Sequence, residues 1–557
     1  MELQNINFTA DNGEKISGRF PQGYTMRNGK LTYTKEDGKT TDIINQFIIV
    51  SAFCQNLEDN THKTELFFYD LDRAEHRLIV NNSDIASRTK LIQLADKGIK
   101  VTERNASALL TYLERYKEEN ESTIPMKKTL SHLGWTNCHR HFLPYSATYF
   151  CDTTEQNKKL TKALTTAGSE KKSLDLIKDL IEHDKINHLL MVCALSSLLI
   201  KFFNVGCFIV HLQGESAETG KSTLYKAIAS MFGNPNLYIT RMDATAPAKR
   251  ETISFLCNLP FILDEMELIP DFEKGKLIQS IYDLTEGQPK DIAQQNGNIK
   301  NNFKTWQTVI MTNGEADILP HNAKKGNLNR VLDIDLETDK SLLFSLDKGN
   351  VKDIASENYG HIAPAFIDLL KLELKVHGKK YKREFTKIQM LLNQTYTNRQ
   401  SDIGALLIIT DKIFINFLNI INGYQVTPLT SGMIERYLKT KEEVDTDTKA
   451  LKSLADSITE NINHFIDVDN EEEIPPHLNV YGLKDNMNIY IIPSIYDKFM
   501  NENGFYNNRK SLIKKLAKEN MLSLPADKKS YQIAKRNPNL NKGVAKRVYA
   551  INIKALD

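Results

Sequence analysis

The sequence predicts an α/β fold built around a parallel sheet covered by helices, with further domains on both sides. Between residues 205 and 340, short apolar segments typical of strands alternate with segments typical of helices, and this alternation indicates a parallel sheet. The expected strands are 207–212, 237–240, 259–263, 308–312 and 331–336. Residues 350–425 show helical apolar periodicity, and the C-terminal part of the chain is strongly basic.

The chain is long enough for several domains. At 557 residues it exceeds the size at which a single hydrophobic core normally divides, so three or four domains are expected. An acidic stretch at 467–476 is typical of a linker. The predicted parts are a mainly β or α+β N-terminal accessory region (1–115), a helical connecting region (116–190), the α/β core (191–345), a helical lid (346–430), and the linker with a basic C-terminal domain (431–557).

Composition narrows the possible classes of protein. Hydrophobic residues make up 41% and charged residues 25%, which is typical of a globular chain, and a net charge of +2 provides no overall attraction to nucleic acid. The apolar run 186–210 is interrupted by Lys201 and Asn204, and the N-terminus lacks a signal pattern, so no membrane segment is expected. Six cysteines without a CxxC pair fit a reducing, cytoplasmic setting.

A phosphate-binding loop is predicted after the first strand of the core. The string FIVHLQGESAETGKST begins as an apolar strand and ends at the start of a helix. Glycine there lets the backbone approach phosphates, and the helix N-terminus supplies positive potential. The expected nucleotide-binding residues are Glu218, Thr219, Gly220, Lys221, Ser222 and Thr223, with ATP and Mg²⁺ as cofactors.

Within that loop, Lys221 is expected to reach the β- and γ-phosphates and Ser222 to bind Mg²⁺. The spacing departs from the usual pattern, because five residues rather than four separate Gly214 from Gly220. Either the loop has one extra residue, or Glu215 takes the position of the first glycine.

Two acidic residues end the next long apolar strand, LPFILDEM. Asp264 is expected to hold Mg²⁺, directly or through water, and Glu265 to orient and polarise the attacking water. Many strands end in an acid, so this assignment depends on the phosphate-binding loop about forty residues upstream.

Two further polar residues follow in the order that such a site requires. Asn313 ends the strand TVIMTN and is predicted to help position the same water, the alternative being a turn residue. Arg330 precedes the last core strand and is predicted to act as an arginine finger on a neighbouring subunit's nucleotide. The alternative for Arg330 is a surface arginine. If Arg330 is a finger, the protein must form oligomers.

A hairpin is predicted between the acidic pair Asp264 and Glu265 and the polar residue Asn313. The insertion 287–305 contains Asn296-Gly297, the strongest short hairpin signal in the chain. In a ring-shaped assembly such a hairpin would point into the pore, where Lys290, Lys300 and Lys304 would contact the phosphate backbone of DNA. A solvated surface hairpin is at least as good an interpretation for any one of these lysines.

The order of ETGKS, FILDE, hairpin, MTN and NRV resembles the hairpin-bearing AAA+ helicases, which include the MCM proteins and the viral superfamily-three helicases. More closely, the strings LGW, LQGESAETGKSTL, LTEGQPKDIAQQNGN and WQTVIMTNGE resemble the MCM-like replicative helicases of staphylococcal cassette chromosome elements, a bacterial family long described as of unknown function. The resemblance covers about residues 100–420.

This resemblance implies an AAA+ core in a hexameric, ATP-driven DNA helicase that replicates a mobile genetic element, with other replication proteins of the element as possible partners. It also implies a sensor-2 arginine from the helical lid, for which Arg399 is the best positional match. Asn296 stands where MCM proteins have a lysine, so the contact with DNA is expected to shift to Lys300.

The C-terminal part has its own charge and pattern. Residues 509–554 contain thirteen lysines and arginines against two acids, a net charge of +11 in a chain whose total is +2. A helix followed by two strands with a basic loop between them predicts a winged-helix domain that binds duplex DNA. A solvated basic face is the alternative.

Two other functions remain open from the sequence. One is an initiator or regulator that binds DNA and uses ATP as a switch without unwinding it. The other is an AAA+ machine that remodels protein.

Overall fold

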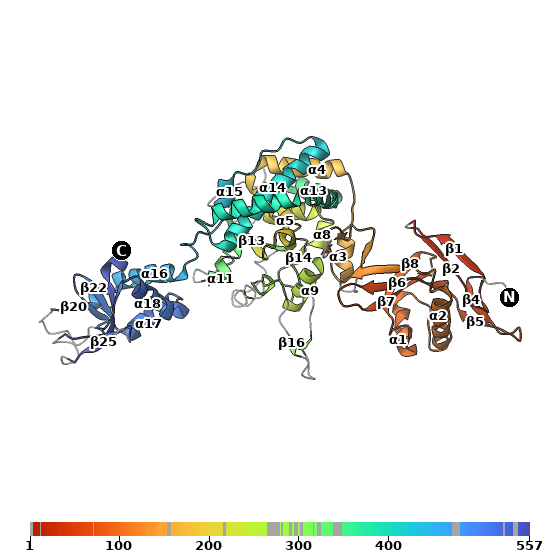
Figure 1. The fold of residues 1–557 in the computed structure, drawn as a ribbon, viewed down its shortest axis with the longest axis horizontal. Coiled ribbons are helices and arrows are strands. Elements are labelled where there is room, and N and C mark those ends of the chain that lie inside the picture. The colour runs from red at the N-terminus through yellow and green to blue at the C-terminus, as the bar shows by residue number, and fades with distance from the viewer. Residues whose placement is uncertain are drawn as a thin grey trace.

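The computed structural model of the chain places three bodies in a row, with the N-terminal part at one end and the C-terminal part at the other (Figure 1). Each end part has a hydrophobic cluster of its own, and the largest cluster lies in the middle part. The structure describes residues 4–11, 13–70, 72–136, 139–152, 157–214, 219–264, 279, 282–288, 292–293, 299–300, 305–315, 317–319, 323, 325–337, 348–469, 479–526, 530–537 and 544–556.

The N-terminal part consists mainly of strands, as predicted. They are β1 (Asn5–Thr9), β2 (Lys15–Arg19), β3 (Tyr24–Arg27), β4 (Lys30–Thr34), β5 (Thr40–Ile44), β6 (Ile48–Asn56), β7 (His62–Tyr69), β8 (Glu75–Asn81), β9 (Met126–Leu130) and β12 (Tyr149–Cys151), with helices α1 (Arg88–Ile92) and α2 (Ala106–Asn120). Its largest sheet has the order β12-β9-β6-β7-β8. The hydroxyl of Tyr112 in α2 donates a hydrogen bond to the carbonyl of Ile48 in β6, which ties the helix to the sheet.

The predicted helical region over 116–190 is wrong in its first part. Residue 115 lies inside α2, and strands β9 and β12 then complete the N-terminal sheet before the first helix of this region begins. Strands β10 (Gly134–Trp135) and β11 (Phe142–Leu143) form a separate pair. Strands β10, β11 and β12 have only two or three residues, too short for an alternating pattern, and β9 (MKKTL) is apolar only at its two ends.

Helices fill the second part of this region. They are α3 (Lys158–Ala163), α4 (Glu170–His183), α5 (Lys185–Ser196) and α6 (Ile200–Phe203). The helical segment from Leu174 to Phe203 is interrupted at Asp184. The side chain of Asp184 accepts a hydrogen bond from the N–H of Ile186 and thereby caps α5.

The middle part contains the predicted parallel sheet. Its strands are β13 (Phe208–Gln213), β14 (Thr240–Arg241), β15 (Phe261–Asp264), β18 (Val309–Gly314) and β19 (Val331–Asp335), joined by α7 (Lys221–Ser230), α8 (Pro235–Tyr238), α9 (Ala246–Leu256) and α11 (Lys325–Leu328). The order is β14-β15-β18-β13-β19, and all pairs are parallel. All residues of β15 and β18 are buried, which is expected for strands covered on both faces.

One strand of this sheet is shorter than predicted. Residues 237–240 were expected to be extended, but Leu237 belongs to α8 and only Thr240 and Arg241 form β14. Asn234 caps α8, and Pro235 occupies its first turn, where proline is favoured because its fixed φ suits the helix. This local helix signal overrides the apolar pattern of the segment.

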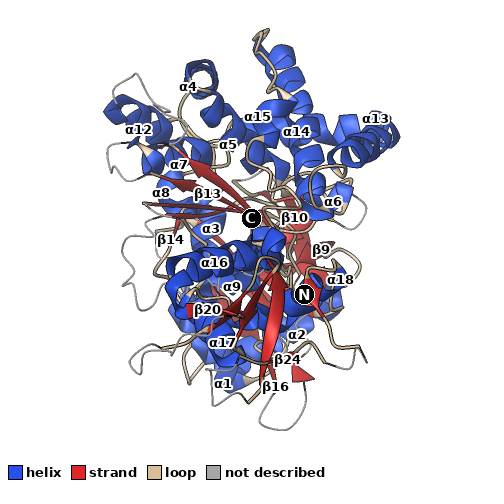
Figure 2. Cartoon of the chain, turned by 90° about the vertical axis from the view of Figure 1, so that its left-hand side faces the viewer, coloured by secondary structure: helices blue, strands red, loops and turns tan. Residues whose placement is uncertain are grey.

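A helical layer covers one side of the sheet, as predicted for the lid (Figure 2). It comprises α12 (Lys348–Glu357), α13 (Ile362–Leu392), α14 (Asn398–Asn422) and α15 (Ser431–Glu435). These helices and the sheet share one hydrophobic cluster that reaches from Leu130 to Val444. Helix α14 is long and apolar enough to cross a membrane by length and composition, but 67% of its apolar window is buried inside the protein, as in the core helix of a globular domain.

The predicted hairpin is present. Strands β16 (Ile292–Ala293) and β17 (Ile299–Lys300) are antiparallel, with Ile292 opposite Lys300 and Ala293 opposite Ile299. Figure 1 shows β16 standing away from the central sheet. The hairpin therefore projects from the segment that links β15 to β18.

The C-terminal part combines helices with a six-stranded sheet. Its elements are α16 (Thr446–Glu460), β20 (Phe465–Asp467), β21 (Gly482–Lys484), β22 (Asn488–Ile491), α17 (Pro493–Glu502), α18 (Arg509–Lys518), β23 (Leu522–Ser523), β24 (Ile533–Lys535) and β25 (Lys546–Asn552). Strand β25 lies between β22 and β23 and also pairs with β24. A helix followed by two paired strands is the predicted arrangement, and α18 packs through Leu512 and Leu516 into a core that includes Ile551.

Candidate functional site

The candidate nucleotide site lies at the carboxyl edge of the parallel sheet. Strands β13, β15 and β18 all end there, since parallel strands point in one direction. Because β18 lies between the other two, its last residues separate the loop that follows β13 from Asp264, the last residue of β15. Ligands of open α/β sheets bind at this edge.

The phosphate-binding loop leads into α7 through a left-handed glycine. Gly220 has φ of +85° and is the N-cap residue of α7, a conformation that side chains with a Cβ adopt only at a cost. Lys221 is the first residue of the helix and is buried. Its ammonium group donates a hydrogen bond to the carbonyl of Gly214, so the lysine bridges the two ends of the loop.

Three side chains from three different elements meet beside this lysine. The hydroxyl of Ser222 donates to the carboxylate of Asp264 at 2.9 Å. The amide nitrogen of Asn313 donates to the same carboxylate oxygen at 2.6 Å and lies 3.4 Å from the Ser222 hydroxyl. A hydroxyl and a carboxylate are oxygen ligands of the type that Mg²⁺ prefers, so these residues fit the predicted metal.

The structure thus brings together Gly220, Lys221, Ser222, Asp264 and Asn313. Thr219 and Thr223 flank this group on the loop and in the first turn of α7. Four other predicted site residues, Glu218, Glu265, Lys290 and Lys304, lie outside the described residues. Glu215 also lies outside them, so whether the loop has one extra residue stays a prediction. Lys300 is the last residue of β17 in the hairpin.

Both predicted arginines lie at the opposite, amino edge of the sheet. Arg330 directly precedes β19, and its carbonyl accepts a hydrogen bond from the N–H of Ile209 at the start of β13. Arg399 is in the first turn of α14, and its guanidinium donates to the carbonyl of Cys207, just before β13, at 2.6 Å. A β-carbon on Gly206 would lie only 2.9 Å from this guanidinium, so the arginine packs where a side chain is absent.

The charge of Arg330 affects the guanidinium of Arg399. Burial lowers the pKa of Arg399, and the nearby charge of Arg330 lowers it further, whereas Glu286 acts in the opposite direction. Arg330 forms an ion pair with Glu286 and donates to the hydroxyl of Thr285 at 3.1 Å. No local pattern in the sequence predicts a role for Thr285 or Glu286, because these contacts join residues 44 or more positions apart.

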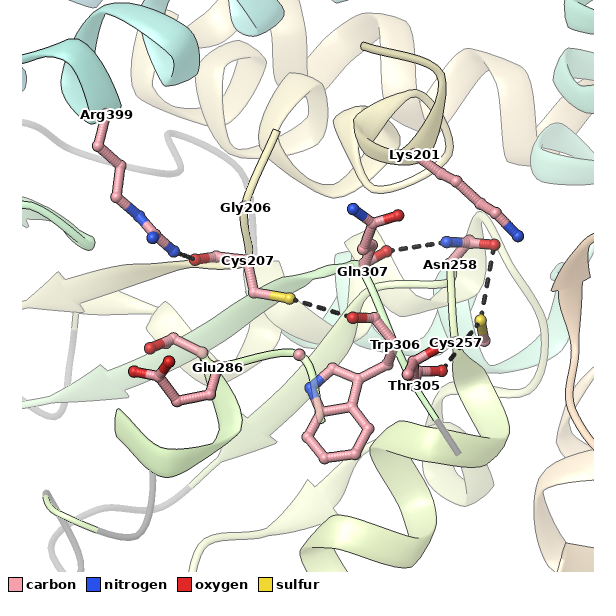
Figure 3. A pocket seen from close by; sticks show the side chains of 12 residues that line it. Lys201, Gly206, Cys207, Cys257, Asn258, Glu286, Thr305, Trp306, Gln307 and Arg399 are labelled. Atoms are coloured by element: carbon pink, nitrogen blue, oxygen red, sulfur yellow. Dashed lines mark hydrogen bonds between the residues drawn. The ribbon is translucent and has the colours of Figure 1, made fainter. Parts of the chain in front are cut away.

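A cavity of about 380 Å³ adjoins this arginine cluster (Figure 3). Figure 3 shows Arg399 on one side of it, Lys201 on the other, and Glu286 and Trp306 below. The cavity is remote from Lys221, because it borders the amino ends of the strands. It therefore belongs to the edge that holds Arg330 and not to the candidate nucleotide site.

A second, smaller cavity of about 340 Å³ lies on the C-terminal part. Its lining residues are Tyr496, Asp497, Arg509, Lys510, Ile513, Lys514, Tyr531 and Tyr549. Arg509 pairs with Asp497 at 3.1 Å and stacks on the ring of Tyr506, so its charge is engaged within the protein. Lys510 and Lys514 are exposed one helical turn apart on α18 and present a basic face.

Comparisons with known proteins support the predicted resemblance to the helicases of staphylococcal cassette chromosome elements. A solved structure described as "SCCmec type IV Cch - active helicase" is similar over 96% of this chain and 98% of its own length, with 16% sequence identity and a TM-score of 0.68. At that identity the similarity shows a shared fold. The apo C-terminal region of NrS-1 matches 69% of this chain and 90% of its own at 10% identity, but its TM-score of 0.25 is too low to indicate a common fold.

Two sequence-family models also match the chain. No curated protein sequence matches the chain. Residues 445–555 match the family described as "Cch helix turn helix domain", which confirms a helix-turn-helix domain where the basic C-terminal domain was predicted. Residues 22–304, just over half of the chain, match the family described as "Domain of unknown function (DUF927)", and the protein belongs to that family.

Proposed function

We propose that this protein is an AAA+ ATPase that works as a DNA helicase or translocase and hydrolyses ATP at the boundary between two copies of the chain. One observation carries the proposal. Ser222, Asp264 and Asn313 come from three elements distant in sequence and converge beside Lys221, where the helix N-terminus points at the same space. That set is suited to bind a triphosphate with its metal.

The residues of the loop hold the nucleotide in this proposal. The backbone around Gly220 and the ammonium group of Lys221 bind the phosphates, and Ser222 with Asp264 holds Mg²⁺. When bound, Mg²⁺ supplies positive charge that offsets the charge developing on the transferred phosphoryl group. Asn313 fixes the orientation of the Asp264 carboxylate, and Glu265, which follows Asp264 in the sequence, takes the role of polarising the attacking water.

The position of the arginines supports the proposed oligomerisation. Strands β13 and β18 have six residues each and span about 20 Å between the edge that holds Arg330 and the edge that holds Lys221. Neither Arg330 nor Arg399 can therefore reach the nucleotide of its own chain. Both arginines can complete a site on a neighbouring copy, Arg330 as the finger and Arg399 as sensor 2, and repeating this head-to-tail contact closes a ring, for which we propose six subunits.

Two parts of the chain are suited to contact DNA. The hairpin of β16 and β17 projects from the segment between Asp264 and Asn313, so Lys290, Lys300 and Lys304 are proposed to contact a strand in the pore. The helix-turn-helix domain, with β24 and β25 as its wing, is proposed to bind duplex DNA through α18. Its exposed Lys510 and Lys514 are suited to phosphate contacts.

The similarity to a structure described as an active helicase favours unwinding over a switch that only binds DNA. Replication of a mobile genetic element, with other proteins of that element as partners, is proposed on the same similarity and on the sequence resemblance. A strand-displacement assay with a forked DNA duplex tests the function. The wild-type chain is expected to separate the strands with ATP, and Lys221→Ala is expected to fail.

Three results separate the alternatives. ATP-dependent DNA binding without strand separation would indicate an initiator or regulator. ATP hydrolysis at a rate that DNA does not change would indicate a protein remodeller. Full turnover by Lys221→Ala would remove the nucleotide site from its proposed place.

A further inference from the structure

The arginine proposed as the finger is bound to the base of the hairpin. Arg330 Nη1 contacts both Glu286, through an ion pair, and the hydroxyl of Thr285 at 3.1 Å. Gly287, which follows Glu286 in the sequence, begins the insertion that carries β16 and β17. The residue that would sense the neighbour's nucleotide therefore contacts the residues from which the proposed DNA-binding hairpin projects.

Hydrogen bonds join the two segments of the chain that enter and leave the hairpin. We call residues 284–287 and 305–306 the hairpin root. The N–H of Trp306 donates to the carbonyl of Gly287 at 2.9 Å, and the indole nitrogen of Trp306 donates to the carbonyl of Leu284 at 2.7 Å. The Trp306 ring is buried. A displacement of Glu286 is consequently transmitted to both sides of the hairpin root.

A negatively charged ligand can replace Glu286 as the partner of Arg330. The Glu286 side chain is 55% exposed, whereas that of Arg330 is 21% exposed, so the pair lies at the surface where a neighbouring chain can approach. A triphosphate brought next to Arg330 competes with the carboxylate for the same guanidinium and repels the carboxylate. The cavity beside Glu286 and Arg399 offers space into which the carboxylate can move (Figure 3).

We propose that Glu286 is a latch that restrains Arg330 until the neighbour's nucleotide displaces it, and that this exchange moves the hairpin root. The latch rests on the proposed function, since it requires Arg330 to act on a neighbouring copy. Coupling between two binding events is reciprocal. A DNA strand that pulls on the hairpin therefore draws Glu286 away from Arg330, which frees the arginine and accelerates hydrolysis.

Removing the latch is expected to separate hydrolysis from DNA. In Glu286→Gln the side chain keeps its size but loses its charge, so the ion pair is lost and the restraint on Arg330 weakens. ATP hydrolysis without DNA is expected to rise about two- to fivefold, the range that an exposed ion pair permits. Hydrolysis with single-stranded DNA is expected to stay unchanged, so the stimulation by DNA falls by the same factor, and fewer base pairs are opened per ATP.

The experiment compares full-length variants in ATPase assays with and without single-stranded DNA. Glu286→Asp keeps the charge and is expected to retain stimulation by DNA. Glu182→Gln is the matched control, because Glu182 is 50% exposed and pairs with Lys178 far from the hairpin root. In the double variant with Arg330→Ala, Glu286→Gln is expected to have no further effect, because the latch acts only through Arg330.

The outcomes distinguish a failure of the latch from a failure of the proposed function on which it rests. If Arg330→Ala loses hydrolysis while Glu286→Gln behaves as wild type, the latch is wrong and the finger stands. A fall of Glu286→Gln to the level of Arg330→Ala also overturns the latch, because Glu286 would then position the finger and not restrain it. Normal hydrolysis by Arg330→Ala would instead overturn the proposed function.

Discussion

The side-chain amide of Asn313 donates a hydrogen bond to the carboxylate of Asp264 at 2.6 Å, joining the ends of two neighbouring strands. The same amide lies 3.4 Å from the hydroxyl of Ser222 at the start of α7. One neutral side chain thus orders both proposed metal ligands, and removal of its amide tests whether that order matters for hydrolysis.

Asn313→Ala is expected to bind ATP but to hydrolyse it more slowly, by a factor on the order of a hundred, as when one positioned donor is removed from an active site. Nucleotide binding and ATPase rate are measured side by side. Asn236→Ala is the control, since Asn236 is exposed on α8. A variant of Asn313 that turns over at the wild-type rate would show that the residue has no part in the reaction.

Gly220→Ala is expected to weaken nucleotide binding and the start of α7. A Cβ at φ of +85° costs about 1–2 kcal/mol, and the loop can avoid that cost only by moving its backbone away from the phosphates. Gly326→Ala in α11 is the matched control, because a Cβ there meets no atom within 4 Å. Equal nucleotide affinity for the two variants, measured by titration calorimetry, would contradict the assignment of the loop.

Lys510→Ala with Lys514→Ala is expected to weaken binding of duplex DNA and to reduce its salt dependence by about two phosphate contacts. Binding is measured by fluorescence anisotropy over a range of salt concentrations. Lys452→Ala on the exposed face of α16 serves as control. An unchanged salt slope in the double variant would place the duplex contact elsewhere in the domain.

Asp333 in β19 is expected to make stability depend on pH. Burial raises its pKa to about 7, with Lys439 acting against this and Asp317 adding to it. Because the folded state holds the proton more tightly than the unfolded chain, the contribution is fully present below about pH 4 and is lost as pH rises through 7. Asp333→Asn should therefore gain stability over the wild type as pH rises.

Denaturant unfolding of wild type and Asp333→Asn at pH 5 and pH 8 checks this effect. Asp353→Asn on the exposed surface of α12 is the control. Parallel stability curves for wild type and Asp333→Asn would show that the Asp333 carboxyl does not titrate between the two pH values.

The sequence predicted elements whose physical signal is local. Gly220 and Lys221 follow an apolar strand and begin a helix, and Asn296-Gly297 marks a hairpin. The order of strand, loop, helix and hairpin is therefore predictable from the sequence. Short strands were missed, since β10 and β11 have two residues each. The apolar pattern of 237–240 predicts a strand, but the capping signal of Asn234 and Pro235 outweighs it and places Leu237 in α8.

Contacts between distant segments were not predictable from one sequence. The place of Arg330 before the last strand predicts its role, but its partner Glu286 is 44 residues away. Arg399 came only from the family resemblance, and its position at the amino edge of the sheet depends on how α14 packs on β13. Such pairings are fixed by tertiary packing and leave no periodic trace in the sequence.

Mixing two inactive variants tests most directly whether the site is shared between copies of the chain. Lys221→Ala retains Arg330, and Arg330→Ala retains the nucleotide loop, so each supplies what the other lacks. In an equal mixture that assembles at random, ATP hydrolysis is expected to recover to about a quarter of the wild-type rate, since one interface in four is complete. A mixture that assembles into rings but stays as inactive as the separate variants would contradict the account.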